Sequence, residues 1–331
     1  MTARPAAVID RVTLIVSDLD RAEDDYVRTF GCSVEQRGDI DPSLIRVLCI
    51  RQAHGRRSLL RLGRERIELL EFTDSAGRPY PPGSTSTDLW FQHMAIVVTD
   101  MRHAYQLVMA NRRFRPISRH GPVRLPDNSG GVTAFKFRDD DGHPLELLAF
   151  PEGRVPGEWR TDNGTGPFLG VDHTAIAVRD TARSARFFRS VFGFSAGTRT
   201  ENHGPEQDNL DDVNDAQVSV TRIAPDLPAP RMEQLHYHVG TRRPIPHDTA
   251  SNDIVATHSV VRVESLDATA AALARRGTPL ADHDLMILRG GMRAALVTGP
   301  DGHRFLVEER AADARQSRLD SPRTLFSTPC R

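Results

Sequence analysis

Imidazole and carboxylate side chains recur in this chain at matched places, and both are common ligands of divalent metals. Four short apolar segments lie about 80 to 85 residues apart, and they begin at Arg11, His93, His173 and His258. A later apolar segment of each copy carries an aligned residue, and these residues are Glu68, Glu146, Glu233 and Leu306. Three histidines and three glutamates at such matched positions predict a metal-binding protein.

The chemistry that suits these groups is proton transfer next to a carbonyl. A divalent metal bound to a carbonyl or enediolate oxygen stabilises negative charge there, so it lowers the pKa of the neighbouring carbon acid. A carboxylate beside the metal can then take the proton, and a second group can return it. Such a site requires that histidines and glutamates from different copies meet in one place.

The elements that must position these residues repeat with the same period. Each first segment has the two alternating faces of a short strand. We expect helices over 20–30, 98–108, 181–192 and 265–274. Two of them stop at Gly31 and Gly193, the usual residue just past a helix end. Three strands then complete each copy, so the pattern predicts four β-α-β-β-β units.

Composition limits the classes of function. The chain has 331 residues, 39% of them apolar, and a net charge of −1, so it has no general attraction for nucleic acid or acidic membranes. No apolar run approaches membrane-spanning length, and three widely separated cysteines indicate a reduced, cytoplasmic protein. Lys136 is the only lysine among 43 basic residues, which we interpret as a consequence of GC-rich codons.

A Pro- and Gly-rich stretch in the middle of the chain marks a boundary between two pairs of units. We expect a first domain at 1–151, a linker at 152–167 and a second domain at 168–309. The segment 310–331 is rich in Arg and Ser and loses the periodicity, so it is expected to be a flexible tail.

This arrangement resembles the vicinal oxygen chelate superfamily, which includes glyoxalase I, bleomycin-resistance proteins and extradiol dioxygenases. The resemblance rests on the segment His173–Asp180 and on the closing segment 141–150, and it covers about residues 8 to 309. It implies an α+β fold of two tandem domains, each a pair of β-α-β-β-β units that form an open, cupped barrel. It also implies that first and last strands of both units supply the ligands of one divalent metal cation (Fe, Mn, Co, Ni or Zn).

Transferring the family's ligand positions pairs the units within each half of the chain. The first site would hold Arg11, Glu68, His93 and Glu146, and the second would hold His173, Glu233, His258 and Leu306. Arg11 and Leu306 depart from the pattern, because neither side chain can ligate a metal. The predicted metal ligands are therefore Glu68, His93, Glu146, His173, Glu233 and His258. Arg11 is predicted to bind the substrate as a fixed cation, while His143 and His303, in Asp-Gly-His turns, are expected to have structural roles.

The residues and the resemblance together favour a metal-dependent isomerase or epimerase of a small polar substrate. Glu68 and Glu146 would be its catalytic groups, on opposite sides of the substrate. Among four-unit members of the superfamily, the chain also resembles the 2-epi-5-epi-valiolone epimerases, which implies a cyclic polyhydroxy ketone such as 2-epi-5-epi-valiolone as the substrate. Two alternatives stay open: an Fe(II)-dependent extradiol-type dioxygenase that uses His173, Glu233 and His258, and a metal-free drug-binding resistance protein. No nucleic-acid or membrane partner is expected, and a homodimer is left open.

Overall fold

The computed structural model describes most of the chain. The described residues are 7–50, 53–160, 166–225, 230–280, 285–288 and 291–309. The predicted tail at 310–331 and a part of the predicted linker, 161–165, lie outside these ranges. No helix within the described ranges is long and apolar enough to span a membrane.

The elements follow one another as four similar units. The first unit comprises β1 (Val8–Ile15), α1 (Leu19–Phe30), β2 (Ser33–Asp39), α2 (Pro42–Val47), β3 (Gly55–Leu62) and β4 (Glu65–Phe72). The second comprises β5 (Gln92–Val98), α3 (Met101–Ala110), β6 (Arg115–Pro116), β7 (Val123–Arg124), β8 (Thr133–Arg138) and β9 (Pro144–Ala149). The third comprises β10 (Phe168–Ala177), α4 (Thr181–Phe192), β11 (Ser195–His203), α5 (Pro205–Asp211), β12 (Gln217–Ala224) and β13 (Arg231–Tyr237). The fourth comprises β14 (His258–Val263), α6 (Leu266–Arg275), β15 (Met286–Ile287), β16 (Arg293–Thr298) and β17 (Arg304–Glu309).

A polar residue two or three positions after each first strand starts the helix that follows. These residues are Asp18, Asp100, Asp180 and Ser265. In all four, the side chain accepts a hydrogen bond from the backbone N–H three residues on, which satisfies a free donor of the first helical turn. α1 and α4 end at Gly31 and Gly193, whose φ angles of 74° and 76° are left-handed. The N-cap residues therefore mark where the chain leaves each first strand and enters the helix that follows.

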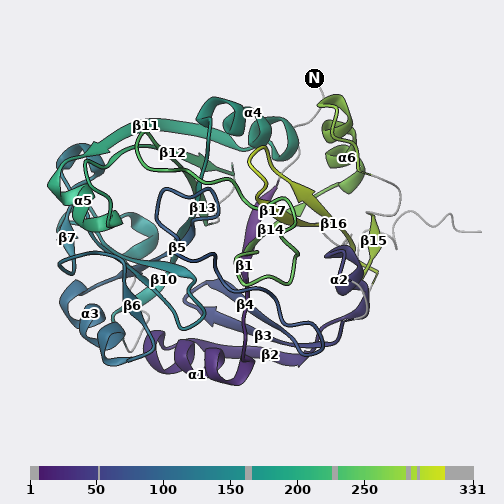
Figure 1. The fold of residues 1–331 in the computed structure, drawn as a ribbon, viewed down its shortest axis with the longest axis horizontal. Helices are drawn as coiled ribbons and strands as arrows, with labels where there is room; N and C mark the ends of the chain where they lie inside the picture. Colours follow the sequence, from purple (N-terminus) through teal and green to yellow (C-terminus); the bar gives the residue numbers. More distant parts are fainter. Residues whose placement is uncertain are drawn as a thin grey trace, which may run out of the picture.

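The strands form two large open sheets, as predicted for an α+β fold with cupped surfaces. Sheet A has the order β15, β16, β17, β14, β1, β4, β3 and β2, and sheet B has the order β11, β12, β13, β10, β5, β9, β8 and β6. In Figure 1, β1 lies beside β14 in one sheet and β5 beside β10 in the other, although these strands are far apart in sequence. We call the concave faces of the two sheets cup A and cup B.

The four units follow one another as the predicted tandem pairs, but the prediction that the two units of each half share one sheet and one cup is wrong. Sheet A joins the first unit to the fourth through antiparallel pairing of β1 with β14, and sheet B joins the second to the third through β5 and β10. The first strands all offer the same kind of free edge, and backbone hydrogen bonds do not distinguish one such edge from another. The repeat therefore predicts the units but not their partners.

The hydrophobic cores, by contrast, mainly follow the two halves of the chain. One core packs residues of α1 and α3 between the first and second units, with Tyr26, Phe30 and Val108 among its members. The other packs α4 and α6 between the third and fourth units, with Phe188 and Leu273 among its members. Figure 1 shows α1 and α3 on one side of the molecule and α4 and α6 on the opposite side. The two units of each half of the chain thus share a hydrophobic core, while each cup combines one unit from each half.

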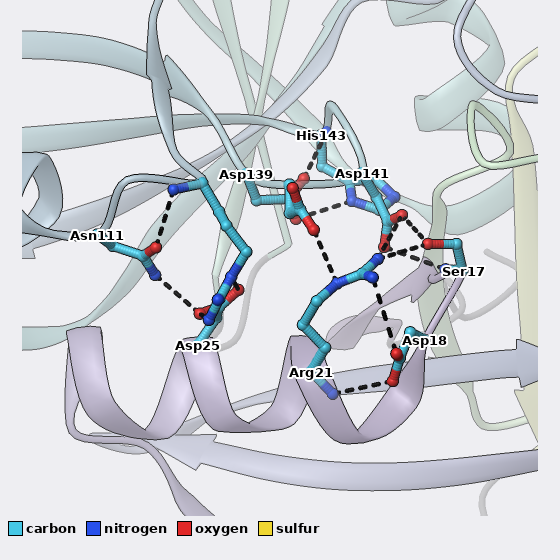
Figure 2. A network of polar contacts seen from close by, with 10 residues as sticks. Ser17, Asp18, Arg21, Asp25, Asn111, Asp139, Asp141 and His143 are labelled. Atoms are coloured by element: carbon cyan, nitrogen blue, oxygen red, sulfur yellow. Dashed lines mark hydrogen bonds and ion pairs between the residues drawn. The ribbon is translucent and has the colours of Figure 1, made fainter.

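A buried polar cluster ties the first unit to the turn between β8 and β9 (Figure 2). The Asp139 carboxylate accepts hydrogen bonds from the Tyr26 hydroxyl at 3.0 Å and from the His143 backbone N–H at 2.8 Å. His143 Nδ1 also lies 2.8 Å from that carboxylate, and Asp141 accepts a bond from the Ser17 backbone. In the fourth unit, His303 Nε2 lies 2.7 Å from the Leu89 carbonyl. These contacts agree with the structural roles expected for His143 and His303.

Candidate metal centre

Four predicted ligands meet on the floor of cup B, and they come from four strands of the second and third units. The antiparallel pairing of β5 and β10 sets Ala175 opposite His93 and Ala95 opposite His173. Parallel pairing then sets Glu146 of β9 opposite Ala95. In the same way, it sets Glu233 of β13 opposite Ala175. The pseudo-twofold arrangement therefore directs two imidazoles and two carboxylates to one place.

The distances suit a single ion. His93 Nε2 lies 2.8 Å from Glu146 Oε2, and His173 Nε2 lies 3.9 Å from the same oxygen. The distance from His173 Nε2 to Glu233 Oε2 is 3.6 Å. One ligand atom each from His93, Glu146 and His173 fall within 4.8 Å of one another, and this is the one such group among the described residues. Ligands bonded at about 2 Å to a common ion are spaced in this range.

Three imidazole nitrogens in this cluster lack a hydrogen-bond partner although they are buried. They are Nδ1 and Nε2 of His93 and Nε2 of His173, and the two Nε2 atoms face the Glu146 carboxylate. The 2.8 Å contact of His93 with Glu146 has the distance of an ion pair but not the alignment of a hydrogen bond. Leaving such polar atoms buried and unpaired is costly. A metal ion would give both Nε2 lone pairs a partner, so the donor set fits a divalent cation.

Asp172 fixes the orientation of one imidazole from behind. Its Oδ2 lies 3.0 Å from His173 Nδ1, so His173 Nε2 faces Glu146 and Glu233. Its Oδ1 accepts hydrogen bonds from Arg231 Nη1 at 2.7 Å and from Trp159 Nε1 at 3.2 Å. A carboxylate behind a histidine is the usual second layer of a metal site, where it holds the ring and makes its free nitrogen more basic.

The charges of the cluster also call for a cation. Its carboxylates belong to Glu146, Glu233, Asp172 and Asp211, and its buried or half-buried cations belong to Lys136 and Arg231. With both imidazoles neutral, as metal binding requires, this set carries a formal charge of −2. A net negative charge is unfavourable among buried groups, and a divalent ion would cancel it.

The pKa values of the four ligands diverge for reasons that the geometry explains. Burial, and then the charge of Lys136, lowers the pKa of His93 to about 4. Burial acts to lower the pKa of His173 too, but the carboxylates of Glu233 and Asp172 outweigh it and raise this pKa to about 9. For Glu146, burial acts upward, yet Lys136 and His93 lower the pKa to about 2. Burial raises the pKa of Glu233. One carboxyl therefore stays ionised while the other is closer to protonation.

Cup A repeats this register with other residues. β1 and β14 set Thr13 opposite His258 and Arg11 opposite Val260, so Arg11 corresponds to His173 and His258 to His93. Glu68 lies opposite Thr13. Leu306, opposite Val260, corresponds to Glu146. An arginine and a leucine thus occupy two of the four ligand positions.

Arg11 is held by carboxylates in the place of a ligand. Its Nε donates to Glu68 at 2.9 Å, and its Nη1 and Nη2 donate to the two oxygens of Glu308 at 3.0 and 2.7 Å. Burial alone would lower the pKa of Arg11, but Glu68 and Glu308 raise it well above its ordinary value. A third carboxylate, from Asp10, accepts from Nη1. This guanidinium has its charge matched within the protein, which leaves the predicted substrate contact of Arg11 without support from the geometry.

Both predicted four-residue sites are therefore wrong as sets. Glu68 and Glu146 lie in different cups and cannot act on one substrate, and His173 and His258 lie in different sheets and cannot share a metal. His258 is buried, with no hydrogen-bond partner on either ring nitrogen, among the residues that the structure describes. The cluster in cup B contains His93 and Glu146 from the first predicted site and His173 and Glu233 from the second.

Several residues around cup B were not anticipated from the sequence, namely Lys136, Asp172, Asp211, Arg231 and Tyr237. Lys136 lines the cavity of about 690 Å³ above the four ligands. Its ammonium lies 2.6 Å from Asp211 Oδ1. The sequence does single out Lys136 in one way, because it is the one lysine of an arginine-rich chain. A cavity of about 910 Å³ lies in cup A, where Arg11, Arg57 and Glu308 contribute to its wall.

Comparison with known proteins agrees with this fold. The sequence model of the Glyoxalase/Bleomycin resistance protein/Dioxygenase superfamily matches residues 8–147 and 170–307. Glyoxalase I from Zea mays is similar in structure, with a TM-score of 0.61 and 15% identity over 95% of this chain and 96% of that one. A protein from Bacillus subtilis, provisionally described as a dioxygenase, has a TM-score of 0.55 and 14% identity over 94% and 87% of the two chains. Identities this low establish the fold alone, and no curated protein matches the chain in sequence.

Proposed function

Because the chain belongs to the glyoxalase/bleomycin resistance protein/dioxygenase superfamily, we propose that it is a divalent-metal-dependent enzyme with its active site in cup B. The reaction is an isomerisation or epimerisation that moves a proton next to a carbonyl of a small polar substrate. One observation carries this proposal: two histidines and two glutamates from four strands converge in one cavity. The ion would polarise the carbonyl and so make the neighbouring carbon more acidic.

The two glutamates have different parts in this reaction. Glu146 lies against both imidazoles, and its lowered pKa keeps it an ionised ligand. Glu233 lies on the opposite last strand, is half-buried and has a raised pKa. Groups with such divergent pKa values divide naturally into a charge-stabilising group and a proton carrier. Glu233 is therefore the proposed base, and His93 and His173 complete the ligand set.

The substrate class follows from the size and polarity of the site. A cavity of about 690 Å³ accommodates a molecule of the size of a hexose or a cyclitol. A cyclic polyhydroxy ketone such as 2-epi-5-epi-valiolone has the carbonyl and the adjacent acidic carbon that the mechanism needs. It remains the candidate that the sequence resemblance suggests.

Metal analysis combined with isotope exchange tests the proposal. Protein isolated without chelators should contain about one equivalent of a transition metal. In deuterated water, turnover should place deuterium on the carbon beside the carbonyl. Glu233→Gln should lower the exchange rate about 10²–10⁴-fold while keeping the metal, and Glu146→Gln should lose both. Glu68→Gln, in cup A, is the matched control that should keep both. Metal-free wild-type protein that gains nothing from added metal would favour the drug-binding alternative.

A second candidate function has one observation in its favour. His93, His173 and Glu146 make up a 2-His-1-carboxylate set, the donor combination of non-haem Fe(II) oxygenases. The set expected from the sequence, His173, Glu233 and His258, does not come together. The carboxylate of Glu233 beside the same site favours proton transfer. Stoichiometric oxygen consumption by the Fe(II)-loaded protein with a catechol would reverse this preference.

A further inference from the structure

Lys136 lies beside the proposed metal site, and its position is unusual for this chain. It is the single lysine, and it is 3% exposed. On β8 it pairs in antiparallel register with Glu146 of β9. Paired residues of neighbouring strands point to the same face of a sheet. The Lys136 side chain therefore points into cup B, where it lines the cavity.

The same register position can be compared in all four units. It is Leu59 opposite Glu68, Lys136 opposite Glu146, Arg222 opposite Glu233 and Leu296 opposite Leu306. Both cations belong to cup B and both leucines to cup A. Cations at this position thus occur in the cup that can hold a metal. A purely structural ion pair would not need to follow this division.

Three buried groups hold the ammonium in place without occupying all its donors. Asp211 Oδ1 accepts from Lys136 Nζ at 2.6 Å, and Asp211 Oδ2 accepts from Tyr237 Oη at 2.9 Å and Gln207 Nε2 at 2.6 Å. The ammonium also lies 5.6 Å from the centre of the Phe91 ring. An ammonium has three N–H donors. Within the described part of the chain, Asp211 is the one acceptor recorded for it, so two donors remain for a ligand in the cavity.

The cations at the cavity wall suit an anionic ligand. The buried and half-buried groups sum to −2, and a divalent ion brings this part to neutrality. The exposed Arg222 at the cavity wall adds a positive charge, and the exposed Glu158, which pairs with Arg231, adds a negative one. The loaded cup is then close to neutral, so it does not repel an anion, and Lys136 and Arg222 are cations that face the cavity.

We propose that Lys136 binds an anionic oxygen of the substrate, and that cup B therefore takes a substrate with a carboxylate or similar oxyanion next to its metal-chelating carbonyl. This inference rests on the proposed function, but it replaces the neutral cyclic ketone named there by the class of α-oxo acids and their analogues. A lysine suits the task because its compact ammonium can bond to Asp211 and to a ligand at once. Asp211 positions it, and Tyr237 in turn holds Asp211.

Oxalate is a probe for this arrangement, because it offers two adjacent oxygens to a metal and a further carboxylate oxygen to a cation. Its dissociation constant is measured by calorimetry on Co²⁺-loaded protein. Lys136→Met should weaken oxalate binding about 10- to 100-fold, the range of one hydrogen bond to a charged group. Co²⁺ affinity should not fall, because the variant removes a positive charge near the ion. Arg37→Met, which removes a cation from the wall of cup A, is the control and should bind oxalate as the wild type does.

Lys136→Met leaves Asp211 buried without its ion-pair partner, so the variant is also made together with Asp211→Asn. Equal oxalate affinity in the wild type and in both folded variants would overturn the proposal, and so would a Co²⁺-loaded wild type that does not bind oxalate. If the protein takes up no metal, the proposed function fails by itself. The lysine is then tested by oxalate binding to the metal-free protein, where the wild type must still bind more tightly than the variants.

Discussion

Two glutamate substitutions at matching strand positions separate the two cups most directly. Glu146→Gln removes the carboxylate that contacts both His93 and His173. Mutating a residue that hydrogen-bonds to a metal ligand typically lowers the metal affinity about 10–100-fold. Removing Glu146, a direct ligand in the proposed site, should therefore lower the metal affinity at least about 100-fold. The metal content after dialysis and a competition titration with a chelator measure this effect.

Glu68→Gln should leave the metal content unchanged but destabilise the protein. Glu68 is fully buried, and its carboxylate contacts Arg11 at 2.9 Å and Arg57 at 2.9 Å. Removing one partner of a buried ion pair costs about 3–5 kcal/mol, a large part of the ordinary stability of a domain. Urea unfolding of the metal-free protein measures the loss. If Glu68→Gln released the metal and Glu146→Gln retained it, the assignment of the two cups would be wrong.

Two further predictions follow from the same contrast. Wild-type protein should bind one equivalent of Co²⁺ by calorimetry. The double variant Arg11→His, Leu306→Glu should bind a second equivalent, because these changes give cup A the metal-binding residues of cup B. A second equivalent bound by the wild type would contradict the assignment of the metal to cup B alone. Burial lowers the pKa of His258 to about 3 and that of His303 to about 4, so the unfolded chain takes up protons first as the pH falls below about 6.5. The stability contributed by these neutral rings is present above that pH, and it should decline towards pH 4 by up to about 1.4 kcal/mol per unit for each histidine. Urea unfolding between pH 7 and 4 should show a shallower decline in His258→Gln, and an unchanged slope would contradict the explanation.

The local part of the fold was predictable from the sequence because its causes are local. The fixed period, the polar residue after each first strand and the glycines at 31 and 193 predict strands and helices that the structure contains. Alternation along each strand also predicts which side chain faces the cup. For this reason the four residues that meet in cup B were all among the candidate ligands.

The partnership of the units was not predictable in this way. It depends on which first-strand edges meet, and four similar edges leave that choice to the packing of whole units. The environment of Arg11 shows the same limit. Glu308 shares a face with Leu306 by the strand period, yet its contact with Arg11 joins residues 297 positions apart. Lys136 carried a usable signal as the single lysine, but composition alone also explained it.

The two cups neutralise their carboxylates in different ways, and this leads to a prediction about metal removal. In cup A the charges of Glu68 and Glu308 are matched by Arg11 and Arg57, which belong to the chain. In cup B the proposed ion would match the carboxylates, so metal binding should stabilise sheet B in particular. A free metal concentration about 100-fold above the dissociation constant adds about 2.7 kcal/mol.

Hydrogen exchange with and without a chelator tests this difference between the sheets. Removing the ion should speed amide exchange in β5, β9, β10 and β13, because the carboxylates of Glu146 and Glu233 then lose the cation between them and His93 Nε2 has no partner. The central strands of sheet A, which are β1, β4, β14 and β17, should exchange at nearly unchanged rates because Arg11 stays in place. Glu146→Gln is the control, since a chelator should have little effect on a variant that binds the metal poorly. Faster exchange confined to sheet A, or equal in both sheets, would mean that the ion does not bind where these four residues converge.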